Sequence, residues 1–323
     1  MASEIDRYRF DVSLEDLQTF LAVTDFGSFS RAAERLHLSQ PSISNRIRRL
    51  EEKLHTHLLE RSTRKLELTP QGRRLYLQSS DTLSQLRTLM REFRGEAATR
   101  AREVHVAATM MVASLGLPYL VRLFHDKHPN VRAMVYDLFP REAIAEVVSG
   151  DCDLAVMSLS ENIAGIRFEP LFEDTCVVVT QRGHPLLRHE AAPLSEVLAE
   201  PLLNPQGLHD LSSTIFAEAN RHGLTVQIAP EAQGVRNTFT LLAMAAAGLG
   251  VCIHPRSFIP MDLKPTIGIV PLRDATIMRA FGLVLPEGRE LSPAAKQFRE
   301  FMHTSVHPGP RPWHPDDVVP PAA

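Results

Sequence analysis

The chain has 323 residues, a formal net charge of −3 and a hydrophobic content of 44%. This length accommodates two or three domains, each with a core of its own. No run of 18 apolar residues occurs, so the sequence predicts no membrane span. The segment Met1 to Asp6 lacks the basic and apolar regions of an export signal, so we expect a cytoplasmic protein with no membrane partner.

Cysteine and histidine usage excludes several classes of site. Cys152, Cys176 and Cys252 lie far apart and form no CxxC pair, which is typical of reduced thiols buried in a cytosolic core. The chain has 14 histidines but no HExxH motif and no Cys/His ligand grid. We therefore expect no bound metal and no cofactor.

The segment from Gly27 to Leu54 predicts two short helices joined by a tight turn. Ser28 and Ser39 are good N-caps, and Pro41 falls in the first turn of the second helix, where a missing N–H costs little. The second helix turns an apolar stripe inward: Ile43, Ile47, Leu50 and Leu54. It leaves a polar set facing outward: Gln40, Ser42, Ser44, Asn45, Arg48 and Arg49.

The charge around this pair of helices distinguishes between two interpretations. Residues 31–74 hold eleven Lys and Arg against five Asp and Glu, a net charge of +6 in a chain whose total is −3. An ordinary surface helix is the alternative, but a basic island in an acidic chain is typical of a nucleic-acid footprint. Gln and Asn pair with adenine and Arg with guanine in the major groove, so the pattern predicts a DNA-recognition helix.

A hairpin is expected next, over residues 56–68, with a basic tip at residues 62–65. It would form a wing beside the recognition helix, although a plain surface turn remains the alternative. With the helix pair it completes the expected DNA-binding set: Arg31, Ser39, Gln40, Pro41, Ser42, Ser44, Asn45, Arg48, Arg61 and Arg64.

A long helix free of glycine and proline follows Gly72 and ends near Arg94. It carries a heptad-like seam: Tyr76, Ser79, Leu83, Leu86, Met90 and Phe93. The helix is too polar to stand alone as a core helix, so it needs a partner helix, most simply from a second copy of the chain.

From Glu103 onward the sequence alternates between strands and helices. Strands are expected at residues 104–108, 131–138, 153–157, 176–180, 226–228, 250–253 and 281–285, and helices at 114–125, 141–149 and 298–303. This alternation predicts an α/β region with a parallel, doubly wound sheet. The Pro-rich segment 306–323 is expected to be disordered.

The segment from Leu14 to Thr69 resembles the N-terminal domain of LysR-type transcriptional regulators. The resemblance rests on an ordered series of motifs: Leu17-x-x-Phe20-x-x-Val23, Gly27-Ser28-Phe29-x-x-Ala32-Ala33-x-x-Leu36, Ser39-Gln40-Pro41-Ser42-x-Ser44, Ile47-x-x-Leu50-Glu51-x-x-Leu54, Leu58-Leu59-x-Arg61 and Leu68-Thr69-x-x-Gly72. Two positions depart from the family pattern, which usually has Gly at the position of His55 and Phe at that of Leu59.

The second half is similar to the effector domain of the same family, itself similar to periplasmic solute-binding proteins. The matching pieces include Gly150-Asp151-Cys152-Asp153-Leu154-Ala155 and Ala246-Ala247-Gly248-Leu249-Gly250-Val251. The resemblance implies two α/β subdomains joined by two crossover strands. The implied domains are a winged helix-turn-helix at 12–69, a dimerising linker helix at 70–95, an effector domain at 103–305 and a tail at 306–323.

The resemblance also implies partners: promoter DNA, a small-molecule effector, a dimer through the linker helix that becomes a tetramer through the effector domains, and RNA polymerase if the protein is an activator. In open α/β sheets ligands bind beyond the carboxyl ends of strands. Free N–H groups there favour an anion. The expected effector site therefore comprises Thr109, Met110, Met111, Phe139, Arg141, Asn204, Pro205, Gln206 and Gly207.

Plainer interpretations of these positions stay open. Thr109 can simply cap a helix, and Arg141 can be a solvated surface arginine. An enzyme carrying a DNA-binding domain is the second functional class, but the chain has no GxSxG, Walker or GxGxxG motif, so we expect no enzymatic activity. The third class is an architectural DNA binder without a ligand.

Overall fold

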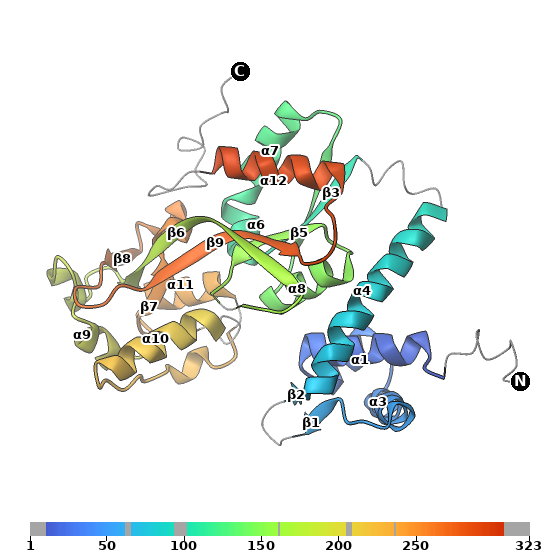
Figure 1. Cartoon of the computed structure of the whole chain (residues 1–323). Helices are drawn as coiled ribbons and strands as arrows, with labels where there is room; N and C mark the ends of the chain where they lie inside the picture. The colour runs from blue at the N-terminus through green and yellow to red at the C-terminus, as the bar shows by residue number, and fades with distance from the viewer. Residues whose placement is uncertain are drawn as a thin grey trace, which may run out of the picture. The chain divides into compact units, whose positions relative to one another are not determined.

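The computed structural model describes residues 11–61, 66–93, 102–160, 162–204, 209–235 and 237–306. The chain divides into two compact units, residues 1–97 with 144–151, and residues 98–143 with 152–323. Figure 1 shows a helical N-terminal unit and a C-terminal unit built on curled sheets. This order of a helical region followed by an α/β region confirms the predicted fold class.

The N-terminal unit is a winged helix-turn-helix followed by a long helix. In chain order its elements are α1 (Leu14–Phe26), α2 (Phe29–Arg35), α3 (Gln40–Leu54), β1 (Leu59–Arg61), β2 (Leu66–Leu68) and α4 (Pro70–Phe93). The two strands pair antiparallel, with Glu60 opposite Glu67, and form the predicted hairpin.

Side-chain caps start the three short helices, two of them at the serines that the sequence predicts. The hydroxyls of Ser28 and Ser39 accept hydrogen bonds from the N–H groups of Arg31 and Ser42, and Ser13 caps α1 in the same way. The helices then close over a core of fully buried side chains: Phe20, Val23, Ala32, Ile43, Ile47 and Leu50. The apolar stripe predicted for α3 is thus the stripe that packs.

Gly72 sits where α4 passes closest to the start of the wing. A Cβ atom at this position would lie 2.0 Å from the carbonyl oxygen of Leu58. The same carbonyl accepts the N–H of Thr69, whose hydroxyl in turn accepts the N–H of Gly72. Only glycine allows this approach, so the residue fixes how the wing meets α4.

The structure corrects the expected seam of α4. Leu83 is buried in the core of its own unit, with 4% of its surface exposed, and Tyr76 donates a hydrogen bond of 2.6 Å to Asp25 of α1. The first part of the seam is therefore covered within the same chain, because α4 packs on α1. Leu89 and Met90, nearer the end of the helix, are 46% and 51% exposed.

The first subdomain of the C-terminal unit contains three parallel strands, β3 (Glu103–Ala108), β4 (Arg132–Asp137) and β5 (Leu154–Ser158), with β3 in the centre. The returning strand β9 (Met278–Pro286) pairs antiparallel with β5. The helices of this part of the chain are α6 (Met110–Leu115), α7 (Leu117–Lys127), α8 (Pro140–Ser149) and α12 (Pro293–Ser305).

The second subdomain is connected to the first by β9 and by the long strand β6 (Ile166–Gln181), which pair with each other. The end of β6 pairs with β7 (Cys252–Pro255) and β8 (Ile267–Val270). Helices α9 (Leu194–Ala199), α10 (His209–Arg221) and α11 (Thr238–Ala246) complete it, with 3-10 turns at Pro185–Arg188, Pro230–Ala232, Arg256–Phe258 and Met261–Leu263. Two apolar cores lie here, and Val178 and Val177, neighbours on β6, belong to different ones.

Several sequence-based assignments differ from the structure; the last helix, for example, begins at Pro293 and not at the expected 298. Within the described residues, Ile228 makes only an isolated bridge with Leu202 and no strand. The single helix expected at 114–125 is replaced by α6 and α7, because the helix is interrupted at Gly116. Strand β6 begins ten residues before the expected 176. Its register shifts between Pro170 and Phe172, as is typical where proline interrupts a ladder.

Candidate DNA-binding interface and effector site

The outward face of α3 carries the predicted recognition side chains. Gln40, Asn45 and Arg48 are exposed, and Ser42 and Ser44 are half-buried. The capping residues Ser39 and Pro41 are exposed at the start of the same helix, and Arg31 is exposed on α2. The structure thus brings most of the predicted DNA-contacting residues onto α3 and the helix before it.

Contacts at the start of α3 orient some of these groups. The hydroxyl oxygens of Ser39 and Ser42 lie 2.8 Å apart, and the hydroxyl of Ser30 donates to Oε1 of Gln40 at 3.4 Å. Arg48 and Glu52 are 3.7 Å apart with both side chains 68% exposed, so this pair holds Arg48 only weakly. Arg61 ends β1, while its side chain and all of Arg64 lie outside the part that the structure describes.

Glu51 connects α3 to the wing. Its carboxylate accepts the N–H of Leu58 at 2.8 Å and the N–H of Leu59 at 3.3 Å. These two backbone groups precede and open β1, so the carboxylate fixes where the wing leaves the recognition helix. The sequence shows Glu51 only as a motif residue, and its role depends on this tertiary contact.

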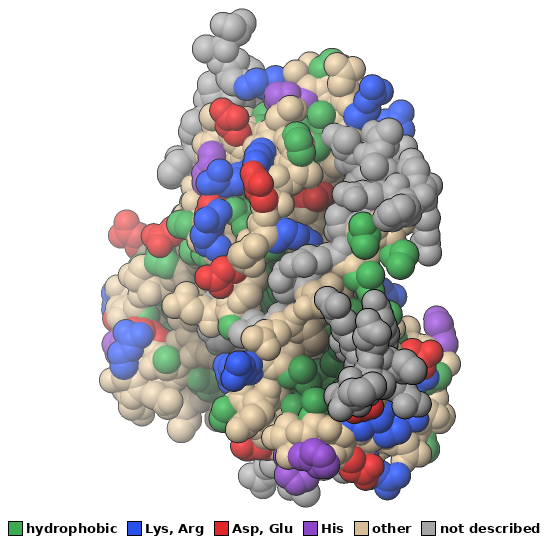
Figure 2. Space-filling model, turned by 45° about the vertical axis from the view of Figure 1, so that its right-hand side comes forward, with side chains coloured by type: hydrophobic (Ala, Val, Ile, Leu, Met, Phe, Trp, Pro, Cys, Tyr) green, Lys and Arg blue, Asp and Glu red, His purple; other side chains and the backbone are tan. Residues whose placement is uncertain are grey.

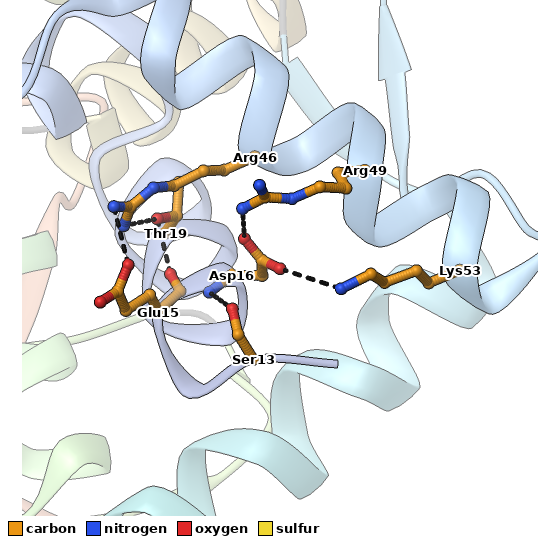
Figure 3. Close-up of polar contacts among 7 residues, drawn as sticks. All are labelled: Ser13, Glu15, Asp16, Thr19, Arg46, Arg49 and Lys53. Carbon is orange, nitrogen blue, oxygen red and sulfur yellow. Dashed lines mark hydrogen bonds and ion pairs between the residues drawn. The ribbon is translucent and has the colours of Figure 1, made fainter. Parts of the chain in front are cut away.

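An ion-pair cluster between α1 and α3 was not predicted (Figure 3). Arg49 Nη2 lies 2.6 Å from Asp16 Oδ1, and Lys53 Nζ lies 3.7 Å from Asp16 Oδ2. Arg46 contacts Glu15 at 2.8 Å and Thr19 at 3.4 Å. The sequence contains a pattern that could have predicted this cluster. Arg46, Arg49 and Lys53 are spaced three and four residues apart, so they share one face of the helix.

The buried carboxylate of Asp16 remains ionised despite its surroundings. Burial raises its pKa, but hydrogen bonds with Arg49 and Ser13 and the positive charges of Arg49 and Lys53 outweigh this effect. The net result is a pKa below the ordinary value of 3.8. The charge count over residues 31–74 omits this acid and Glu15, so it overstates how many basic groups are unpaired.

The predicted effector residues of the first subdomain follow two adjacent parallel strands. Ala108 of β3 lies opposite Asp137 of β4, so residues 109–111 and 139–141 leave the sheet at the same edge. Thr109 is the N-cap residue of α6, yet its side chain makes no capping hydrogen bond.

The individual side chains at this edge differ in accessibility. Met111 is 7% exposed and packs in the subdomain core, whereas Met110 is half-buried and Arg141 is exposed. The N–H of Phe139 is already occupied by the carboxylate of Glu142, at 3.2 Å. This edge of the sheet therefore carries both an exposed cation, Arg141, and a carboxylate, Glu142.

The remaining predicted residues belong to the second subdomain. Asn204 is half-buried, and its Oδ1 accepts a 2.8 Å hydrogen bond from the hydroxyl of Ser212. Pro205, Gln206 and Gly207 lie outside the described residues. On the face drawn in Figure 2, basic and acidic side chains are interspersed and form no large patch of one sign.

All three cysteines are buried and none forms a disulfide. Burial raises the pKa of the Cys252 thiol to about 12. Thiolate is the reactive form of cysteine, so a thiol held in this way is a poor nucleophile. Within the described residues no group of three or more His, Cys, Asp or Glu could hold a metal ion, and no helix is long and apolar enough to cross a membrane.

Two known sequence families match the chain. The family described as "Bacterial regulatory helix-turn-helix protein, lysR family" matches residues 14–73, and "LysR substrate binding domain" matches residues 97–306. The OxyR dual regulator of Escherichia coli K12 is 26% identical over 291 residues, covering 90% of this chain and 94% of OxyR. The regulator TtuA of Agrobacterium vitis is 26% identical over 311 residues, covering 91% of this chain and 98% of TtuA.

Solved structures agree with these matches. An H2O2-bound mutant of OxyR from Corynebacterium glutamicum is 25% identical, with a TM-score of 0.55, covering 91% of this chain and 94% of that one. The LysR regulator CbnR, at 23% identity and a TM-score of 0.53, shares the fold. The chain therefore belongs to the LysR family of DNA-binding transcriptional regulators, which carry an effector-binding domain, bind promoter DNA and small-molecule effectors, form oligomers and are not enzymes.

Proposed function

We propose that this regulator reads its promoter through the outward face of α3 and the wing, and that a small anionic molecule changes how it binds. The observation that carries the first part is the exposure of Gln40, Asn45 and Arg48 on one capped helix. Bidentate side chains on a rigid helix suit base edges, while basic groups on α2 and the wing suit phosphates.

Replacing Gln40 by Ala tests the reading of bases. We expect a loss of about 1–3 kcal/mol on the cognate site and little change on random DNA. Replacing Arg64 should weaken binding to both and reduce the salt slope, because it would contact phosphate. Fluorescence anisotropy on a site selected from a random library provides both affinities. Equal losses on cognate and random DNA for the Gln40 variant would refute the assignment.

For the effector, we infer a site formed by residues 109–111 and 139–141 with Asn204 and residues 205–207. Two observations support it: residues following β3 and β4 share one sheet edge, and the Thr109 side chain makes no capping bond. Arg141 is exposed there and available to a carboxylate. A ligand that prefers one arrangement of the two subdomains would shift the population of DNA-binding states.

A thermal-shift screen of small carboxylates and phosphates tests this site. A ligand that binds only the native state raises the melting temperature. Against a hit, Thr109→Val should cost about 1 kcal/mol of ligand affinity and leave DNA binding without ligand unchanged. Unchanged affinity in both Thr109→Val and Arg141→Ala would place the ligand elsewhere. No hit in the screen would favour a DNA binder without an effector.

The proposed assembly is a cytoplasmic dimer through α4 that becomes a tetramer through the effector domains, and an activator form would also contact RNA polymerase. Exposed apolar side chains support two self-association surfaces. One is at Leu89 and Met90 on α4, and the other is at Met134, Val135 and Tyr136 on β4, which ends its sheet.

A further inference from the structure

Helix α3 carries its basic residues in two sets. Arg48 is exposed on the same side as the proposed base-reading residues. Arg46, Arg49 and Lys53 instead extend toward α1, where they meet Glu15 and Asp16, as Figure 3 shows. The second set lies beside the recognition face without belonging to it. Its positive charges could bind DNA phosphates, but they are paired with acidic side chains instead.

The burial of this cluster is uneven. The Asp16 side chain is completely buried, whereas the Arg49 side chain is 55% exposed and that of Lys53 is 34% exposed. The carboxylate is therefore fixed, and the two cations reach it from the solvent side. Lys53 Nζ is too distant for a hydrogen bond at 3.7 Å, so Asp16 Oδ2 has no hydrogen-bond partner among the described residues.

A DNA phosphate would compete with Asp16 for the same cations. Every Lys or Arg that neutralises a phosphate strengthens binding to any sequence and steepens the salt dependence by about 0.9 in log K against log salt. A partly exposed arginine beside the recognition face would add such a contact if it were unpaired. Such a contact carries no sequence information, so it would raise the affinity for cognate and random DNA alike.

We propose that Asp16 limits sequence-independent DNA binding: it retains Arg49 and Lys53 on α1, withholds them from the DNA backbone and so lowers the affinity for any DNA. The base-reading residues then account for a larger share of the affinity for the cognate site. A purely structural role, in which the cluster only fastens α3 to α1, makes a different prediction, because losing it would weaken binding to both kinds of DNA.

The test is Asp16→Asn, which keeps the size of the side chain and removes its charge. Affinity for random and for library-selected DNA is measured over a range of salt concentrations. We expect random-DNA affinity to rise at least about fivefold at low salt, with a salt slope steeper by up to about 1.8, since two cations are released. Cognate affinity should rise by a similar factor, because the released cations would contact phosphate and not bases. Weaker binding to both DNAs would overturn the proposal.

Two controls separate pairing from net charge. Glu34→Gln changes the charge of the same unit by one, and Glu34 is exposed with no ion pair in the described part of the chain. It should raise random-DNA affinity much less than Asp16→Asn does. In Asp16→Asn/Arg49→Gln about half of the gain on random DNA should remain, because Lys53 is still released. An equal gain in Glu34→Gln, or a full gain in the double variant, would contradict the assignment.

A further variant decides the matter even if Asp16→Asn folds poorly. Because Arg49 is already withheld from DNA, Arg49→Gln alone should change random-DNA affinity by less than about twofold. Arg31→Gln, which removes an exposed arginine of α2, serves as the comparison and should weaken random binding clearly. If Arg49→Gln weakened it as much as Arg31→Gln, Arg49 would be a phosphate contact and the proposal would be wrong.

Discussion

At the scale of the residue, His55 occupies a conformation that usually belongs to glycine. It is the C-cap of α3, with φ of 49° and ψ of 37° in the left-handed region. A side chain there is strained because Cβ approaches the following carbonyl. The N–H of His55 nevertheless donates to the carbonyl of Glu52. The helix thus ends with a left-handed residue, as expected where the family usually has Gly, although His is less favourable there.

Replacing His55 by Gly should therefore stabilise the N-terminal unit by about 1 kcal/mol. Relief of strain of about 1–2 kcal/mol exceeds the extra entropy that glycine loses on folding, about 0.5–1 kcal/mol. Urea unfolding monitored by circular dichroism measures the change. His57→Gly is the matched control, since His57 has no positive φ and should gain nothing. Similar effects of the two substitutions would argue against strain at His55.

Glu169 on β6 is a second residue whose environment decides its chemistry. It accepts hydrogen bonds from Arg299 at 2.6 and 2.9 Å and contacts His303 at 3.0 Å, both on α12. Burial raises its pKa, but the bonds from Arg299 and His303 and the charges of Arg299 and Arg167 lower it below the ordinary 4.5. This carboxylate joins a crossover strand to the last helix.

Glu169→Gln should lower the free energy of unfolding at pH 7 by about 2 kcal/mol. Because the folded pKa is depressed, the stabilisation is fully present above 4.5 and is lost as pH falls through the folded value. The gap between wild type and variant should thus narrow on acidification in denaturant unfolding. Exposed Glu190 provides the control, Glu190→Gln. A gap that stays constant down to pH 3 would show that the charge is not responsible.

At the scale of the element, α4 serves two purposes along its length. Its first part packs on α1 through Tyr76 and Leu83. Leu89 and Met90 lie beyond this contact and are exposed. Apolar side chains on a polar helix favour association with another helix.

Leu89→Asp/Met90→Asp should dissociate the proposed dimer without unfolding the chain, because it places charges only on the exposed part of the helix. Leu83→Asp should instead destabilise the N-terminal unit, because it buries a charge. Light scattering and thermal melts distinguish the two results. Thr82→Asp, at an exposed position of α4, is the control and should change neither. If the molecular mass from light scattering were unchanged in the Leu89/Met90 variant, these residues would not form the interface.

At the scale of the whole molecule, the relatives include proteins described as hydrogen peroxide-inducible genes activators. This chain has three cysteines, all buried. The thiol of Cys252 has its pKa raised to about 12, which leaves almost no thiolate at neutral pH. Peroxide oxidises the thiolate of accessible cysteines, so the burial of all three argues against sensing of this kind.

Treatment with hydrogen peroxide should therefore leave DNA affinity unchanged. A thiol reagent should modify none of the three cysteines rapidly in the native protein and all of them after unfolding. Anisotropy before and after oxidation, with E. coli OxyR treated in parallel, measures the effect. A peroxide-induced change in affinity that Cys252→Ser abolished would contradict this expectation.

Features that depend on neighbours along the chain could be predicted from the sequence. Caps at Ser28 and Ser39, the apolar stripe of α3 and the alternation of strands and helices after Glu103 all follow from local periodicity and local hydrogen bonding. The recognition face of α3 was predicted for the same reason, since a helix fixes which side chains share a face. These were enough to identify the family.

Which of these groups remain available could not be predicted, because it depends on packing between distant elements. The tertiary structure pairs Arg49 with Asp16, buries Leu83 and Met111, and extends β6 through Pro170. Asp16 and Arg49 are 33 residues apart, and their contact depends on how α1 crosses α3. A sequence specifies a residue's charge and the face of its helix, but its partner is set by packing between distant elements, which no local pattern encodes.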